Sequence, residues 1–255
     1  PLARRMLADS DMVRTTVAEM VGLRSGRVRV GATPSLCIGV LSDVLRVFHA
    51  RHPEIAVELA EDGSQPLEAA LVQGELDVAL VIVPPDGVDP TLHTAPLLRE
   101  RLSVASPRAR RPLTPRGSMT VSELARHDLV MVRQGYDLRE VTLRAYAVAG
   151  VTPRIAVEGG QMDAVLRMVE AGTGVAVVPD LTFIGRPRLR RTVLNPAIHR
   201  TVALARRADI APTPAVIAFA DTLLEHMSDT SASLREGMTD VQVLHRHRTG
   251  RELLG

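Results

Sequence analysis

Residues 27–83 constrain the fold of this chain most, because strand-like and helix-like apolar patterns alternate along them. The spacing predicts a strand at 28–30, a helix over 40–50, a strand at 55–59, a helix over 67–73 and a strand at 78–83. Pro53 ends the first helix and Gly74 ends the second. Strands that alternate with helices form a parallel sheet covered on both faces. Such sheets bind ligands at the carboxyl ends of their strands, where helix N-termini point.

The same alternation returns in the second half of the chain. The pattern predicts strands at 101–105, 129–132, 154–157, 175–178 and 202–205, and helices at 123–126, 138–149, 161–170 and 215–227. Ser122 and Asp137 are the expected N-caps of two of these helices. Residues 102–203 repeat the order of the opening unit, which predicts two α/β lobes of one architecture. Residues 228–255 lose the pattern and are expected to be a disordered or loosely docked tail.

The composition excludes several classes of protein. Aromatic residues make up only 2% of the 255, which argues against a nucleic-acid or sugar site built on stacked rings. All 31 basic residues are Arg and the net charge is +2; Arg clusters at 108–111 and 186–191 are read as solvated surface rather than as a phosphate-binding patch. Cys37 is the one cysteine, and core packing is its favoured role. The chain has neither a membrane-length apolar run nor a secretion signal, so a cytoplasmic location is expected.

Several blocks together carry a resemblance to a known family. These are RVRVGATPS, the segment LRVFHARHPEIAVELAEDGS, the GELDVAL block, and PLLRERLSVASP, followed in lobe II by GVTPRIAVEGGQMDAVLRMVEAGTGVAVVPD. They closely resemble the regulatory region of LysR-type transcriptional regulators over about residues 1–227. Residues 1–24 resemble the latter part of that family's linker helix. The family's N-terminal winged helix-turn-helix has no counterpart in these residues.

The resemblance implies a fold of two Rossmann-like lobes with a cleft between them, like that of type 2 periplasmic binding proteins. The chain would cross between the lobes near Arg101 and Ala203, so that residues 25–101 with 204–227 form lobe I and residues 102–203 form lobe II. It also implies a small-molecule effector, a homodimer or homotetramer, and DNA binding through a domain missing from this chain. No cofactor or metal is expected.

Four helices are predicted to begin at strand carboxyl ends, and their N-termini offer unpaired N–H groups that suit a carboxylate. The effector contacts implied by these loops and by the resemblance are Thr33, Pro34, Ser35, Ser64, Arg133, Gln134, Gly135, Tyr136, Gly160 and Gln161. Each has an alternative role. Ser64 could be only an N-cap, Arg133 a surface charge, and Tyr136 a core residue.

Association is expected through the helix 40–50 and through the first 24 residues. Met6, Val13 and Met20 recur every seven residues, as in a weak coiled-coil seam, although this helix could also pack on its own domain. The expected interface residues are therefore Met6, Val13, Met20, Val40, Val44 and Val47.

Catalytic motifs are absent: the chain contains no G-x-S-x-G, no H-E-x-x-H and no phosphate-binding G-x-x-x-x-G-K-[ST] motif. Gly172 and Gly174 follow a helix and precede a strand, so they are read as a helix stop. The leading hypothesis is a sensor domain. The alternatives are a transport solute-binding protein or a two-lobed enzyme such as a dehydratase, for which Asp137 and Glu158 would be the available carboxylates.

Overall fold

The structure is a computed structural model that describes residues 26–84, 87–236, 241–244 and 249–255. The chain divides into two compact units. Unit 1 contains 26–99, 201–236 and 242–255 of the described residues, and unit 2 contains Glu100–Arg200 with Val241. The expected linker helix, with Met6, Val13 and Met20, lies outside the described residues.

Unit 1 is built on the strands that the opening stretch predicts. β1 (Gly26–Ala32), β2 (Ile55–Glu61) and β3 (Val78–Val83) are joined by β4 (Leu92–Pro107), β9 (Leu189–Arg207) and β10 (Val241–Val243), in the order β10-β4-β9-β3-β1-β2. β1 pairs in parallel with both β2 and β3, whereas β3 and β9 are antiparallel. The parallel centre of the sheet agrees with the strand–helix alternation. β4 and β9 are long strands that run on into unit 2.

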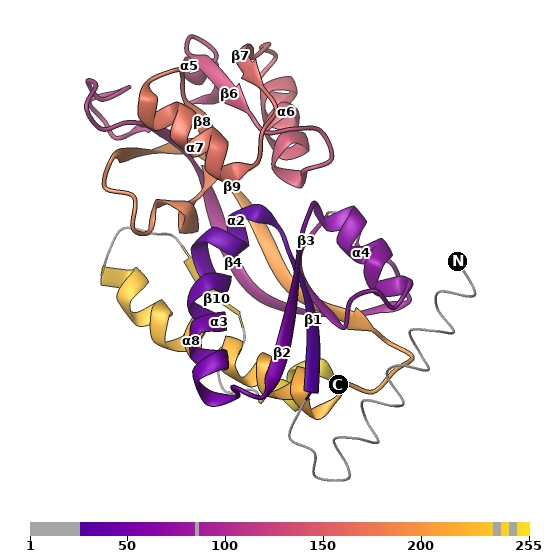
Figure 1. The fold of residues 1–255 in the computed structure, drawn as a ribbon. Coiled ribbons are helices and arrows are strands. Elements are labelled where there is room, and N and C mark those ends of the chain that lie inside the picture. The colour runs from indigo at the N-terminus through magenta and orange to yellow at the C-terminus, as the bar shows by residue number, and fades with distance from the viewer. Residues whose placement is uncertain (1–25, 85–86, 237–240, 245–248) are drawn as a thin grey trace. The chain divides into compact units, whose positions relative to one another are not determined.

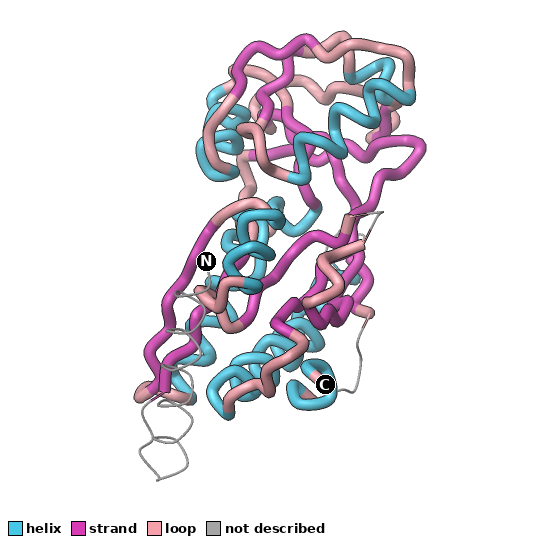
Figure 2. The backbone as a smooth tube through the Cα atoms, turned by 90° about the vertical axis from the view of Figure 1, so that its right-hand side faces the viewer, coloured by secondary structure: helices cyan, strands magenta, loops and turns pink. Residues whose placement is uncertain are grey.

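Helices lie on both sides of the unit 1 strands (Figure 1, with the turned view in Figure 2). The run from Pro34 to Arg51 is continuous and consists of α2 (Pro34–Leu36), the π-helical η1 (Cys37–Leu41) and α3 (Ser42–Arg51). It packs on α8 (Pro214–Glu236) through Phe48 and Phe219, whose ring centroids are 5.7 Å apart. α4 (Ser64–Val72) covers the other side, where its leucines join the core cluster Leu67, Leu71, Leu76, Ala79, Val81, Leu92 and Ala205. This two-sided burial explains why β3 is an unbroken apolar run.

Unit 2 repeats the strand–helix alternation on a smaller scale. Its elements are β5 (Ser118–Met119), α5 (Val121–Leu124), β6 (Asp128–Met131), α6 (Asp137–Val148), β7 (Arg154–Glu158), α7 (Met162–Ala171), β8 (Ala176–Pro179) and the 3₁₀ helix η2 (Asp180–Phe183). β6 and β7 are parallel, so their carboxyl ends lie side by side. β8 pairs with the unit 2 part of β4, and β5 pairs with β9.

The C-terminal region forms secondary structure where the structure describes it, which fits the docked alternative for the tail better than disorder. α8 continues to Glu236, and α9 (Gly250–Leu254) packs against it. Leu253 and Leu254 are buried, and the buried guanidinium of Arg206 donates to the carbonyl oxygen of Leu254 over 2.6 Å. Burial of Leu253 and Leu254, together with the hydrogen bond from Arg206, stabilises this segment although its own sequence shows only a weak helical pattern.

Two of the expected N-caps are wrong. The N-cap of α5 is Thr120 rather than Ser122, and it forms a capping box with Glu123. The N-cap of α6 is Tyr136 rather than Asp137, which is the first helical residue. Both errors are shifts of one or two residues, the usual uncertainty of helix ends.

Two of the expected interface residues are core residues. Val40 and Val44 are buried inside unit 1, where their side of the helix faces the sheet and α8. A side chain that is buried within its own unit cannot form the contact surface of a partner. Val47 is half-buried and remains a candidate.

Candidate functional site

The loop after β1 presents the first group of predicted effector residues. Thr33 is the N-cap of α2, with Pro34 as the first helical residue and Ser35 as the second. All three are buried. The hydroxyl of Thr33 neither caps the helix nor bonds to any other described residue, whereas its backbone oxygen accepts the N–H groups of Leu36 and Cys37. A buried hydroxyl without a partner is unusual in a folded protein.

Ser64, after β2, is tied to the neighbouring strand. Its Oγ accepts the backbone N–H of Ile82 in β3 over 3.0 Å, and the side chain is buried. The N-cap of α4 is Gly63, so the alternative reading of Ser64 as an N-cap is wrong. Because β1 lies between β2 and β3, this bond holds the β2 loop against the end of β3, near the loop that carries Thr33.

In unit 2, the predicted residues come together at the carboxyl ends of β6 and β7. The N–H of Arg133 donates to the oxygen of Gly160 over 3.4 Å, which joins the loop 132–136 to the loop 159–161. Arg133 is exposed and its guanidinium lies 4.4 Å from the ring centroid of Tyr136, a cation–π arrangement. Tyr136 is buried, yet its hydroxyl has no hydrogen-bond partner among the described residues. Gln134, Gly135 and Gln161 are exposed beside them.

Helix capping differs between the candidate loops and three other helices of the described chain. The helices α2, α4, α6 and α7, which each follow a strand's carboxyl end, have N-cap residues whose side chains form no capping bond. Elsewhere in the described chain, the helices α5, α8 and α9 are capped by the hydroxyls of Thr120, Thr213 and Thr249. Uncapped N-termini keep N–H donors and a partial positive charge available, a combination that binds anions.

Cys37 lies just inside the first uncapped helix and is half-buried. Burial, with a smaller contribution from the nearby carboxylate of Glu61, raises the pKa of its thiol to about 12. A thiol with such a pKa stays protonated and is a poor nucleophile near neutral pH. This agrees with the expectation that Cys37 is a packing residue.

Glu158, one of the two carboxylates considered for catalysis, is engaged by an arginine in the structure. Glu158 forms an ion pair with Arg139, with 2.8 Å between nitrogen and oxygen, and the guanidinium of Arg139 also donates to the carbonyl oxygen of Val132. Arg139 therefore braces both loops of unit 2, a role that the sequence analysis missed. The clue that the sequence offers to this role is the position of Arg139, two residues into the helix α6. The described residues contain no group of three His, Cys, Asp or Glu side chains that could hold a metal ion.

Comparison with known proteins decides the family. Residues 22–228 match the LysR substrate binding domain. The chain belongs to the LysR substrate-binding-domain family. This confirms the resemblance and the fold class drawn from the sequence.

Two solved LysR-type domains share this fold, although neither exceeds 22% sequence identity. The CcmR regulatory domain of Synechocystis PCC6803 in complex with 2-PG has a TM-score of 0.71, with 80% of this chain and 99% of that chain covered. The BenM effector binding domain with its effector benzoate has a TM-score of 0.67, with 80% of this chain and 93% of that chain covered.

A curated relative is more similar in sequence. The HTH-type transcriptional regulator TtuA of Agrobacterium vitis is 33% identical over 160 residues, which are 61% of this chain. The match spans about half of that relative, 51% of its length. The described helices of this LysR-type domain include none long and apolar enough to cross a membrane.

Proposed function

We propose that this chain is the small-molecule-sensing domain of a LysR-type transcriptional regulator, with DNA binding supplied by another domain. Family membership supports a regulatory role, since the matched relatives are transcriptional regulators. The observation that carries the proposal is a contrast in helix capping: the predicted effector loops have uncapped N-termini, whereas α5, α8 and α9 of the described chain carry threonine caps.

The proposed effector is a small carboxylate or a similar anion. The uncapped helix ends supply N–H donors, Thr33 and Tyr136 supply hydroxyls without a described partner, and Arg133 supplies a cation. BenM is described with benzoate and CcmR with 2-PG, both small molecules that these domains hold. A ligand of this kind changes a regulator only through its different affinity for two arrangements of the assembly.

Calorimetric titration of the chain with a panel of small carboxylates, starting from benzoate and 2-PG, tests the proposal. We expect Thr33→Val and Arg133→Gln each to weaken binding of the best hit by roughly tenfold, because each removes a donor to the anion. The matched controls Thr152→Val and Arg144→Gln alter exposed residues outside these loops and should bind normally. Equal affinities in all four variants would contradict the site.

We propose a non-enzymatic role, so the same hits should not be turned over. Support comes from the regulator relatives and from the pairing of Glu158 with Arg139. Product analysis of each bound compound separates a sensor from a two-lobed enzyme. Conversion of a hit would favour the enzyme.

We propose further that the domain acts in the cytoplasm as a homodimer or homotetramer, since a regulator works at the DNA. The exposed side of α3 around the half-buried Val47, together with residues 1–24, for which the sequence pattern predicts a helix, is the suggested contact surface. The molar mass of the chain and of the Val47→Asp variant, measured by light scattering, tests the oligomeric state. A monomer at tens of micromolar, or an unaltered mass in the variant, would count against that surface.

A further inference from the structure

The two arginine stretches noted in the sequence come together in unit 2. The N–H of Arg108 donates to the oxygen of Arg188 over 2.8 Å, and the guanidinium of Arg190 donates to the oxygen of Arg110 over 2.6 Å. These bonds hold the turn after β4 against the start of β9. Residues 80 positions apart thus form one basic surface.

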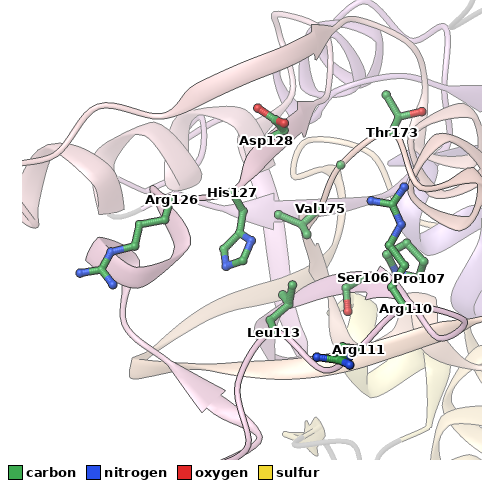
Figure 3. Close-up of a pocket in the computed structure, with 11 residues that line it drawn as sticks. Ser106, Pro107, Arg110, Arg111, Leu113, Arg126, His127, Asp128, Thr173 and Val175 are labelled. Atoms are coloured by element: carbon green, nitrogen blue, oxygen red, sulfur yellow. The ribbon is translucent and has the colours of Figure 1, made fainter.

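Beside this surface lies a hollow of about 510 Å³, a size typical of small-molecule sites (Figure 3). Its walls come from the end of β4, the turn that follows, the start of β6 and the segment after α7. The polar and charged residues in these walls include Ser106, Arg110, Arg111, Arg126, His127 and Asp128. Figure 3 shows Arg110 and His127 on opposite sides of Val175, with Ser106 below them.

Ser106 is evidence for a bound ligand that does not depend on the arginines. It is 1% exposed, it lines the hollow, and its hydroxyl has no hydrogen-bond partner among the described residues. Buried hydroxyls in folded proteins are almost always paired, either within the protein or with something bound. An anion in the hollow would supply the missing acceptor.

The charge of the hollow is positive. Among the described residues, no carboxylate forms an ion pair with Arg110, Arg111 or Arg126. The one acidic residue in the wall, Asp128, is neutralised by Arg154, whose Nε lies 2.7 Å from its carboxylate. In Figure 3 that carboxylate points away from Val175 and the hollow. Part of the role of Arg110 is structural, since its guanidinium packs against Gly172 at the end of α7.

We propose that this hollow is a second ligand site, for a small anion with two or more negative charges, such as a diphosphate or a tricarboxylate. Arg110 and Arg111 bind the anion and Ser106 donates its hydroxyl to it. The site is distinct from the proposed effector loops and does not depend on them. It adjoins Asp128 at the amino end of β6, whereas the loop with Arg133 and Tyr136 follows the carboxyl end.

A small molecule fits this surface better than a nucleic acid does. Backbone phosphates are bound on open surfaces by exposed cations, and they would not reach a buried hydroxyl such as that of Ser106. A compact anion in the hollow would have Ser106 and both arginines in the wall around it. The volume also suits a metabolite-sized molecule.

Titration of the purified chain with pyrophosphate and with citrate, at matched ionic strength in chloride, tests the inference. We expect saturable binding and a raised melting temperature with at least one of the two anions, and the stronger of them assigns the ligand as phosphate-like or carboxylate-like. The double variant Arg110→Gln, Arg111→Gln should weaken binding by at least roughly tenfold, because charge-assisted hydrogen bonds are lost. Arg144→Gln removes an exposed arginine that does not line the hollow and should bind as the parent does.

Ser106→Ala separates a ligand role from a structural one. The variant removes a hydroxyl that pairs with no described residue, so the free protein should melt at the same or a higher temperature, while anion affinity falls several-fold. Absence of saturable binding, or unchanged affinity in both the arginine and the serine variants, would overturn the proposal. So would a random DNA duplex that binds through Arg110 and Arg111 when neither anion binds.

Discussion

At the scale of single residues, polar pairing explains which side chains serve stability and which are available for ligands. Arg29 and Asp77 show the first case. Asp77 accepts the backbone N–H of Arg29 over 2.7 Å and its guanidinium over 2.6 Å, and Arg29 also donates to the oxygen of Gly74. Thr33, Tyr136 and Ser106 show the second case, because their buried hydroxyls have no described partner. The sequence shows which residue types occupy these positions, but it does not show whether their polar groups are paired.

Replacing Asp77 with Ala should lower the free energy of unfolding by roughly 2 to 4 kcal/mol, because a poorly exposed guanidinium and a backbone N–H lose their acceptor. Urea unfolding followed by circular dichroism measures this in a chain without Trp. Asp43→Ala is the control: Asp43 lies 3.8 Å from Arg46 and both side chains are well exposed, so the change should be about 1 kcal/mol or less. Similar losses in both variants would contradict the argument.

Alkaline pH should destabilise the chain through two groups with raised pKa values. Burial, with a contribution from Glu61, raises the pKa of Cys37 from 9.0 to about 12, and burial raises the pKa of Tyr146 from 10.0 to about 12. The unfolded chain therefore releases these protons first, so stability is full below about pH 9 and falls as the pH rises towards 12. Urea midpoints along this range should decline less steeply in the double variant Cys37→Ala, Tyr146→Phe. An equal slope would show that other groups dominate.

At the scale of elements, local pattern and packing each determine part of the result. The predicted alternation of strands and helices is confirmed in the described part of residues 26–227, because apolar periodicity reflects which face of each element is buried. Helix starts were less predictable: Ser122 and Asp137 lose the N-cap position to Thr120 and Tyr136. Several polar residues in a row can cap a helix, and backbone packing selects among them.

The docking of α9 on α8 depends on close backbone approach at Gly250. A Cβ at this position would lie 2.6 Å from the oxygen of Ile217 and 2.8 Å from the nitrogen of Asp221. We expect Gly250→Ala to cost roughly 1 to 3 kcal/mol and to speed hydrogen exchange in residues 250–255, because neither backbone atom can yield easily. Arg251→Ala, on the exposed side of α9, should leave exchange nearly unaltered. Slow exchange in both variants would mean that α9 does not need this contact.

At the scale of the whole molecule, a buried ion pair stands where the chain passes between its two units. Glu100 and Arg200 are the first and last residues of the main segment of unit 2, on β4 and β9. Arg200 donates to Oε1 of Glu100 over 2.7 and 2.9 Å, and Oε2 accepts the N–H of Leu181. Both side chains are almost completely buried. The family resemblance implies crossings near Arg101 and Ala203, but a local pattern cannot match an acid with a base 100 positions away.

Glu100→Ala should destabilise the chain by about 3 to 5 kcal/mol, because the variant leaves a buried guanidinium without its partner. The double variant Glu100→Leu, Arg200→Met removes both charges and should recover much of that loss, in urea unfolding followed by circular dichroism. If the double variant is no more stable than the single one, the pair is not the source of the effect. An unchanged single variant would also reject the argument.

The sequence alone determined the fold class, the two-part organisation and the family, because buried faces leave a periodic apolar pattern and the motif blocks are local. It also placed the candidate loops at strand ends. Only the tertiary structure decided that Val40 and Val44 belong to the core, that the end of the chain docks as α9, and that the two arginine stretches meet beside Ser106. The reason is physical: burial, pairing of polar groups and the meeting of distant charges depend on which elements pack together, and local periodicity carries no record of that.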